Sequence, residues 1–212
     1  MGKLDLRKDS QFLYTPSSKK VGLVEVPAFN FLMIDGSIES GQSPGTSPLF
    51  QENMQALYGA AYTLKFMAKL RKDEPVDFPV MALEGLWWVE DGHFDIQVKD
   101  NWFYTLMILQ PSLITSEMFA EALAQMRKKK GNLPGFARLR LESFEEGLCI
   151  QIMHIGSYDA EPATVEKMDA FAQAMGFSKR GKHHEIYLGN PLRADPAKLK
   201  TILRHPVQNS MP

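Results

Sequence analysis

The order of the predicted elements repeats along the chain. Strand-like segments lead to a helix and then to further strands, once within residues 21–111 and again within 138–190. Apolar alternation predicts strands, and apolar residues every three or four positions predict helices. The predicted strands cover 21–38, 78–90, 94–111, 138–158 (a hairpin) and 183–189, and the predicted helices cover 49–72, 115–135, 161–177 and 195–205. This order predicts an α+β fold, with duplicated modules forming an antiparallel sheet, helices on one face, and a ligand cleft between the modules.

The same pattern divides the chain into parts. Residues 1–20 are polar and are expected to form a flexible lead-in, before one domain at 21–207. Module one spans about 21–111 and module two about 138–190. Asp195 and Pro196 are expected to start a short C-terminal helix, 195–205, because proline is favoured in the first helical turn.

Composition excludes several classes of protein. The formal net charge of the 212 residues is −1, which favours neither direct nucleic acid binding nor an anionic membrane surface. Cys149 is the only cysteine, so an intrachain disulfide framework is excluded and a reducing, cytoplasmic location is expected. The charged N-terminus does not resemble a signal peptide, and no apolar run is long enough to span a bilayer.

The segment HHEIYLG, residues 183–189, places an acid within an apolar strand. Because side chains alternate between the two faces of a strand, His183, Glu185 and Tyr187 share one face. Burial raises the pKa of a carboxyl group, which makes it a usable proton acceptor or donor near neutral pH. A carboxylate among aromatic rings can also hold a cationic ligand. The alternative is a solvent-facing Glu185 with Tyr187 as an ordinary neighbour.

Aromatic residues crowd the strands expected to lie beside it. In the strand at 78–90, Glu84 shares a face with Leu86 and Trp88, while Trp87 lies on the other. Glu84 and Glu185 are both expected to point into one concave surface, although Glu84 could instead pair with a basic residue at a sheet edge. Trp102 and Tyr104 share one face of the next strand, and His154 and Tyr158 share a parity on the hairpin. The candidate ligand-binding residues are Glu84, Trp87, Trp88, Trp102, Tyr104, His154 and Tyr158.

Metal and cofactor sites are not expected. The adjacent His183 and His184 diverge on a strand, and no paired-cysteine or His-Glu-x-x-His spacing occurs. No glycine-rich phosphate loop is present. His154 has the alternative of a hydrogen-bonded structural role, and each tryptophan that does not face the cleft is expected in the core.

Five segments together carry a resemblance to a known family: VEVPAFNFLMIDG (24–36), LEGLWW (83–88), WFYTLMILQPSLIT (102–115), IQIMHIGSYDAEPAT (150–164) and HHEIYLGNPLRADPAKLKTILRHPV (183–207). Through them the chain resembles the GyrI-like small-molecule-binding family, and within it a free-standing subfamily that includes cyclopropanoid cyclopropyl hydrolases. The resemblance implies a pseudo-twofold fold of two strand–helix–strand–strand modules. It implies that an acid on the last strand, Glu185, reaches into the cleft with Tyr187 beside it, and that an aromatic cage forms from Trp87 or Trp88 and from Trp102 or Tyr104.

Three functions follow as hypotheses. The first is a cofactor-independent hydrolase that opens the cyclopropane ring of flat, electrophilic, DNA-alkylating compounds. In it Glu185 activates water, Tyr187 stabilises charge on the conjugated oxygen, and Glu84 is a possible second acid. The second is a module that sequesters hydrophobic or cationic drugs without turnover, with Glu185 as counter-charge. The third is an inhibitor of a cellular protein that acts through its surface, which the sequence supports least.

Overall fold

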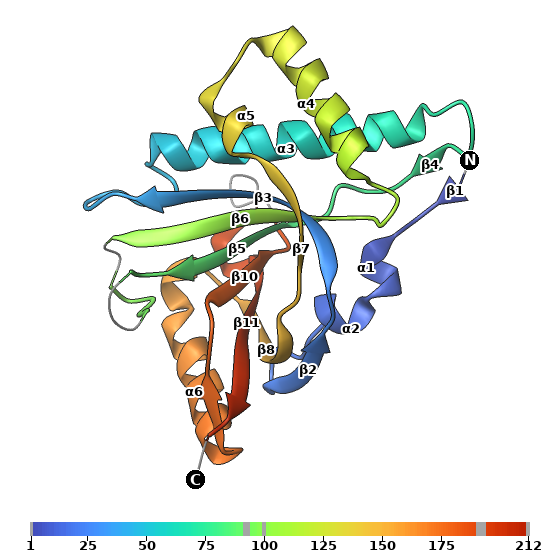
Figure 1. Cartoon of the computed structure of the whole chain (residues 1–212). Coiled ribbons are helices and arrows are strands. Elements are labelled where there is room, and N and C mark those ends of the chain that lie inside the picture. The colour runs from blue at the N-terminus through green and yellow to red at the C-terminus, as the bar shows by residue number, and fades with distance from the viewer. Residues whose placement is uncertain (1, 91–93, 99–100, 190–193, 211–212) are drawn as a thin grey trace.

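The computed structural model describes residues 2–90, 94–98, 101–189 and 194–210. Within them, nine strands form a strongly bent antiparallel sheet, and a short parallel pair lies apart from it (Figure 1). The predicted α+β fold is confirmed.

The strands are β1 (Gly2–Lys3), β2 (Gly22–Val26), β3 (Phe29–Ile38), β4 (Val76–Asp77), β5 (Leu83–Trp88), β6 (Trp102–Gln110), β7 (Arg140–Phe144), β8 (Gly147–Ile155), β9 (Phe177–Lys179), β10 (His183–Tyr187) and β11 (Lys200–Asn209). The helices are α1 (Leu6–Asp9), α2 (Gln11–Tyr14), α3 (Pro48–Lys69), α4 (Ser116–Lys130), α5 (Pro134–Arg138) and α6 (Pro162–Ala174), with 3-10 turns η1 (Tyr158–Ala160) and η2 (Pro196–Lys198).

Two modules with the same chain order meet in the middle of the sheet. Module one contains β3, α3, β5 and β6, and module two contains β8, α6, β10 and β11. The strand order β2-β8-β11-β10-β5-β6-β3-β7 places β10 of one module against β5 of the other. The strand–helix–strand–strand repeat therefore exists in the topology, and its junction is the β5–β10 pair.

The main helices begin where the sequence provides a cap. The Ser47 hydroxyl accepts a hydrogen bond from the Phe50 backbone N–H at 3.3 Å, and Pro48 occupies the first turn of α3. The Thr115 hydroxyl accepts from Met118 N–H at the start of α4. α3 covers module one, α6 covers module two on the same face of the sheet, and α4 packs on α3 rather than on the sheet (Figure 1).

The region expected to be a C-terminal helix, 195–205, is instead the short turn η2 followed by the central strand β11. β11 pairs with both β8 and β10, so its burial on two sides outweighs the local helical pattern. One sequence feature agrees with a strand: Thr201 and Ile202 are β-branched.

The hairpin predicted at 138–158 is also wrong, although both of its strands exist. β7 pairs with β3 at one end of the sheet, whereas β8 pairs with β2 and β11 near the other end. The connection at 145–146 therefore carries the chain from module one to module two. The predicted strand at 94–111 begins only at Trp102, and 94–98 form a turn. Most of the hairpin turn predicted at 90–93 lies outside the described residues.

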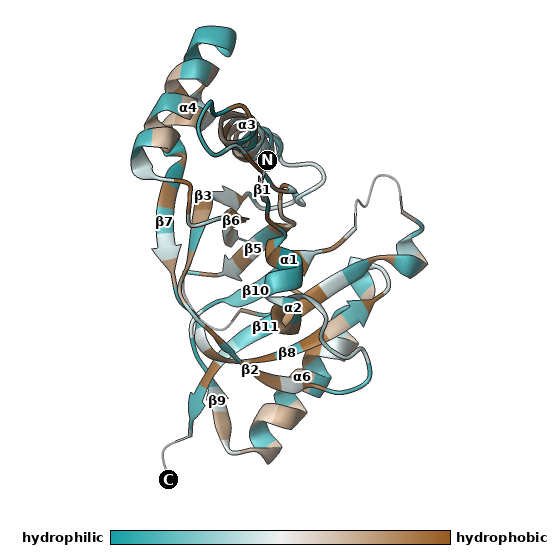
Figure 2. Ribbon diagram, turned by 90° about the vertical axis from the view of Figure 1, so that its right-hand side faces the viewer, coloured by the Kyte–Doolittle hydropathy of each residue, from teal (hydrophilic) through white to brown (hydrophobic). Residues whose placement is uncertain are grey.

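The N-terminal segment was expected to be a flexible lead-in, but it packs against the sheet. Leu13 and Tyr14 of α2 are buried, and Leu13 carbonyl oxygen accepts a hydrogen bond from Arg204 at 2.9 Å. In Figure 2, α1 and α2 lie over the middle of the sheet, on the face opposite to α3 and α6. No helix within the described residues is long and apolar enough to cross a membrane.

Candidate functional site

The junction between the modules places Glu185 in the centre of the sheet. Across the β5–β10 pair, Glu185 lies directly opposite Gly85, and His183 lies opposite Trp87. Side chains of directly paired residues share a face, so Glu185, Tyr187 and Trp87 project together toward α3 and α6. Gly85 leaves the space for this arrangement, because a Cβ atom there would lie 2.8 Å from Trp87 Nε1 and 3.3 Å from the Tyr187 hydroxyl.

A short hydrogen-bond chain joins these side chains. Trp87 Nε1–H donates to the Tyr187 hydroxyl at 3.0 Å, and that hydroxyl donates to Glu185 Oε2 at 2.7 Å. Glu185 is only 6% exposed. Burial, reinforced by the neighbouring Glu185 charge, raises the pKa of Tyr187 well above its usual value. Tyr187 therefore stays protonated, and the chain presents a fixed donor beside a buried carboxyl group.

Aromatic rings enclose the indole of Trp87. Phe50 from the first turn of α3 stacks on it with ring centroids 6.0 Å apart. Trp102 and Tyr104 on β6 each approach it with centroids 5.6 Å apart. The structure thus brings Glu185, Tyr187, Trp87, Trp102 and Tyr104 together. It resolves the alternative left open by the sequence, because Trp87 and not Trp88 lies on this face.

His183 is a site residue that the sequence analysis considered only as a metal ligand. Its Nε2 lies 3.4 Å from Glu185 Oε1 and forms no hydrogen bond within the described structure. The ring of His183 stacks on Phe94, with centroids 5.6 Å apart, and Phe94 also contacts Trp102. The shared parity of His183 and Glu185 was the signal for this neighbour. Phe94 carried no such signal, because it lies outside any strand.

Tyr158 and His154 lie at the edge of this cluster. Tyr158 meets Tyr187 edge-to-face with centroids 6.0 Å apart and remains 37% exposed. Burial, together with the nearby Glu161 and Glu185 charges, raises its pKa to about 12. The buried His154 bonds to the Thr164 hydroxyl at 2.9 Å and to Ser157 carbonyl oxygen at 3.1 Å. The structural alternative therefore fits His154, which holds the turn that carries Tyr158 against α6.

The expectation that Glu84 and Glu185 share one surface is wrong. Glu185 pairs with Gly85, so the adjacent Glu84 must point to the opposite face. There, His184 lies between two carboxylates: its Nε2 is 3.0 Å from Glu84 and its Nδ1 is 2.9 Å from Glu146. The Tyr14 hydroxyl donates to the other oxygen of Glu84 at 3.1 Å. Glu84 therefore belongs to a buried charge network beneath α2, which we call the His184 network (Glu84, His184, Glu146, Arg204).

The His184 network is electrically balanced. Burial alone lowers the pKa of His184, but attraction and hydrogen bonding to Glu146 and Glu84 outweigh that effect and raise it to about 9. Glu146 also accepts a hydrogen bond from Arg204 at 3.2 Å. Two cations thus face two carboxylates, with side chains at most 3% exposed. A buried group of this composition holds α2 and the sheet together.

Trp88 also lies on the face opposite to Glu185. It stacks on Phe103, its neighbour on β6, with ring centroids 6.0 Å apart, and Lys182 Nζ lies 3.2 Å from the indole centroid. Trp88 therefore does not belong to the aromatic cluster around Glu185. No group of three or more potential metal ligands occurs within residues 2–90, 94–98, 101–189 and 194–210.

Comparisons with known proteins agree with this fold. The sequence model of the GyrI-like small molecule binding domain matches residues 19–208. An uncharacterized conserved protein from Listeria innocua is 40% identical, with a TM-score of 0.87, over 97% of this chain and 100% of that one. A hydrolase encoded by lin2189 from Listeria innocua is 38% identical, with a TM-score of 0.83 and the same coverage.

A more distant structure shares the fold alone. The EcmrR C-terminal domain is 10% identical, with a TM-score of 0.53, over 90% of this chain and 98% of that one. No curated protein matches the chain at a significant level.

Proposed function

Because this chain belongs to the GyrI-like small-molecule-binding family, we propose that its Glu185 site binds flat, electrophilic aromatic compounds and hydrolyses them. The observation that carries the proposal is the hydrogen-bond chain from Trp87 through Tyr187 to Glu185, inside an aromatic enclosure. The rings offer stacking surfaces to a planar ligand, and the carboxylate offers a proton acceptor. The similar Listeria innocua proteins that are named hydrolases, 37% and 38% identical over their full lengths, support turnover.

The reaction we propose is water addition to a cyclopropane ring conjugated to a carbonyl group. Glu185 removes a proton from water, and the water oxygen forms a bond to the least substituted ring carbon. The strained carbon–carbon bond breaks, and its electron pair moves into the conjugated system as an enolate or phenolate. A donor such as Tyr187 stabilises that charge, and the proton returns from Glu185 to the product. The sum is addition of one water, which needs no metal or organic cofactor.

Access to Glu185 requires movement of side chains. Glu185, Trp87 and Tyr104 are at most 6% exposed, so an aromatic ligand needs the cluster to open. Tyr158, Tyr187 and Phe94 are the members that reach solvent, and we propose that the ligand enters between Tyr158 and Phe94. Replacing Phe94 with alanine should then speed ligand entry, measured as the association rate by stopped-flow tryptophan fluorescence.

The test is a mass-resolved incubation with a cyclopropane-bearing, DNA-alkylating model compound. The wild-type protein should yield a product heavier by one water, and Glu185→Gln should lose acceleration on the order of 10²-fold or more, the usual contribution of acid–base catalysis. Glu121→Gln, an exposed acid on α4, is the matched control and should keep the wild-type rate. Turnover by Glu185→Gln at the wild-type rate would show that Glu185 has no catalytic role.

A second function, sequestration of cationic drugs without turnover, has its own supporting observation. Among the described residues, no lysine or arginine pairs with Glu185, whose neighbours are the Tyr187 hydroxyl and His183, so this buried carboxylate can act as counter-charge for a ligand cation. Aromatic faces add attraction for the same cation. Tight binding of a lipophilic cation, with unchanged mass after long incubation and loss of binding in Glu185→Gln, would favour this function over hydrolysis.

A further inference from the structure

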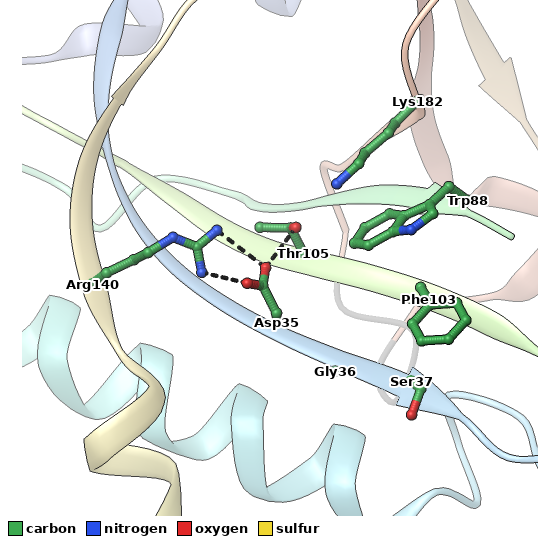
Figure 3. Close-up of a pocket in the computed structure, with 8 residues that line it drawn as sticks. All are labelled: Asp35, Gly36, Ser37, Trp88, Phe103, Thr105, Arg140 and Lys182. Atoms are coloured by element: carbon green, nitrogen blue, oxygen red, sulfur yellow. Dashed lines mark hydrogen bonds and ion pairs between the residues drawn. The ribbon is translucent and has the colours of Figure 1, made fainter. Parts of the chain in front are cut away.

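An open pocket lies on the face of the sheet opposite to Glu185. It has a volume of about 380 Å³, within the size range of small-ligand pockets. Figure 3 shows its two walls: the Arg140–Asp35 pair on one side, and Trp88 with Phe103 on the other, with the ammonium of Lys182 directed into the space between them. We call it the Lys182 pocket. Its lining is completed by Gly36, Ser37 and Thr105.

The Lys182 pocket shares strands β5 and β6 with the Glu185 site. On β5, Trp87 faces the Glu185 site and Trp88 faces the pocket. On β6, Tyr104 faces the Glu185 site, while its neighbours Phe103 and Thr105 face the pocket. Strand alternation therefore places the two sites back to back, separated by the thickness of the sheet.

The basic residues of the pocket differ in their partners. Arg140 is fully engaged, because its guanidinium forms two hydrogen bonds to Asp35, at 2.8 and 3.1 Å, and one to Glu142 at 2.7 Å. Asp35 also accepts from the Thr105 hydroxyl at 2.7 Å. Two carboxylates therefore already satisfy the Arg140 guanidinium, and the pair with Asp35 forms one wall of the pocket. A charged group of a ligand is therefore little stabilised by Arg140 and Asp35.

Lys182 is the exception. No carboxylate among the described residues lies within ion-pair distance of its Nζ, which instead rests over the Trp88 ring. Partial burial lowers the pKa of Lys182. A half-buried ammonium without an ion-pair partner at contact distance, set against an indole, can be stabilised by an anion that also covers the aromatic surface.

We propose that the Lys182 pocket is a second ligand site, distinct from the Glu185 site, for a flat aromatic carboxylate. The carboxylate of the ligand pairs with Lys182 Nζ, and its ring system packs against Trp88 and Phe103. Asp35, held by Arg140 and Thr105, forms the opposite wall and disfavours ligands with a second negative charge. The site does not depend on the chemistry proposed for Glu185.

The three tryptophan indole N–H groups provide a direct assay. Trp87 Nε1–H donates to Tyr187 and Trp102 Nε1–H donates to Val98 carbonyl oxygen at 2.6 Å, and the two rings contact each other in the aromatic cluster beside Glu185. Trp88 alone faces the pocket. In ¹H–¹⁵N spectra assigned with tryptophan-to-phenylalanine variants, titration with 2-naphthoate should move the Trp88 indole signal and leave the other two in place. Movement of the Trp87 or Trp102 signal instead would place the probe in the Glu185 site and overturn the proposal.

Variants and a neutral probe test the charge. Lys182→Met should weaken 2-naphthoate binding by about tenfold or more, as expected for a hydrogen bond to a charged group, while Lys182→Arg should retain most of the affinity. Lys129→Met, at an exposed position of α4, and Glu185→Gln are the matched controls. Both should leave the affinity for 2-naphthoate unchanged. The uncharged isostere 2-naphthamide should bind about tenfold more weakly. Equal affinity for the acid and the amide, or no effect of Lys182→Met, would refute an anion site.

Discussion

Raising the pH should destabilise this protein through the buried His184 network. His184 lies between Glu84 and Glu146, and their charges raise its pKa in the folded state to about 9, from an ordinary value of 6.5. Between these values the native state holds a proton that the unfolded state has released. Stability must therefore decrease as pH rises, since the state that binds more protons is penalised by their removal. The contribution is complete below pH 6.5 and disappears above pH 9.

The size of the effect follows from the two pKa values. One proton difference changes the free energy of unfolding by at most about 1.4 kcal/mol per pH unit. Near each of the two pKa values the difference in bound protons is only partial. The expected loss of unfolding free energy between pH 6.5 and 8.5 is therefore about 2 kcal/mol. This upper limit of pH 8.5 keeps clear of Cys149, whose pKa burial raises to about 12 and which adds its own pH dependence above the ordinary thiol value of 9.

Urea unfolding at pH 6.5, 7.5 and 8.5, followed by circular dichroism, measures this loss, with the slope of free energy on urea concentration expected to stay constant. Glu84→Gln removes one of the two carboxylates and should reduce the pH dependence. His184→Gln should abolish it and lower stability at pH 6.5 by about 3–5 kcal/mol, because two carboxylates lose a buried partner. His154→Gln, another buried histidine, should keep the wild-type pH dependence. A wild-type stability that is flat or rises from pH 6.5 to 8.5 would refute a charged His184.

Two further substitutions test the packing on each face of the sheet. Gly85→Ala puts a methyl group 2.8 Å from Trp87 Nε1, so it should disrupt the hydrogen-bond chain to Glu185. The affinity of the Glu185 site for its aromatic ligand, measured by calorimetry, should decrease at least tenfold. Tyr14→Phe leaves one oxygen of buried Glu84 without its donor and should cost about 1–3 kcal/mol in urea unfolding, while ligand affinity at Glu185 stays unchanged. Unaltered stability of Tyr14→Phe would mean that α2 does not depend on that contact.

The parts of the fold that depend on local signals could be predicted from the sequence. The helix α3 follows from Ser47, Pro48 and its apolar spacing, and the faces of β5, β6 and β10 follow from alternation. The grouping of Glu185 with Tyr187, and of Trp102 with Tyr104, needed only that alternation. Strand β11 could not be predicted from local signals alone, because it is a strand through its pairing on both sides with β8 and β10. The modular repeat itself contained that information: a second module of strand, helix and two strands requires a strand after β10.

The role of Glu84 depended on the pairing register between β5 and β10, which neither strand alone determines. Alternation within β5 and within β10 assigns faces separately, but only the pairing between them decides whether Glu84 and Glu185 project together. A register in which Glu185 lies opposite Gly85 separates the two acids, and a slip of one residue would have joined them. With Gly85 at that position, the sheet can accept both Trp87 and Tyr187 above it, which alanine would prevent. The same register sends Glu84 to a histidine that neutralises it. One acid thereby stabilises the fold beneath α2, and the other, which pairs with no lysine or arginine in the described part of the chain, lies on the opposite face, where we propose that an aromatic ligand binds.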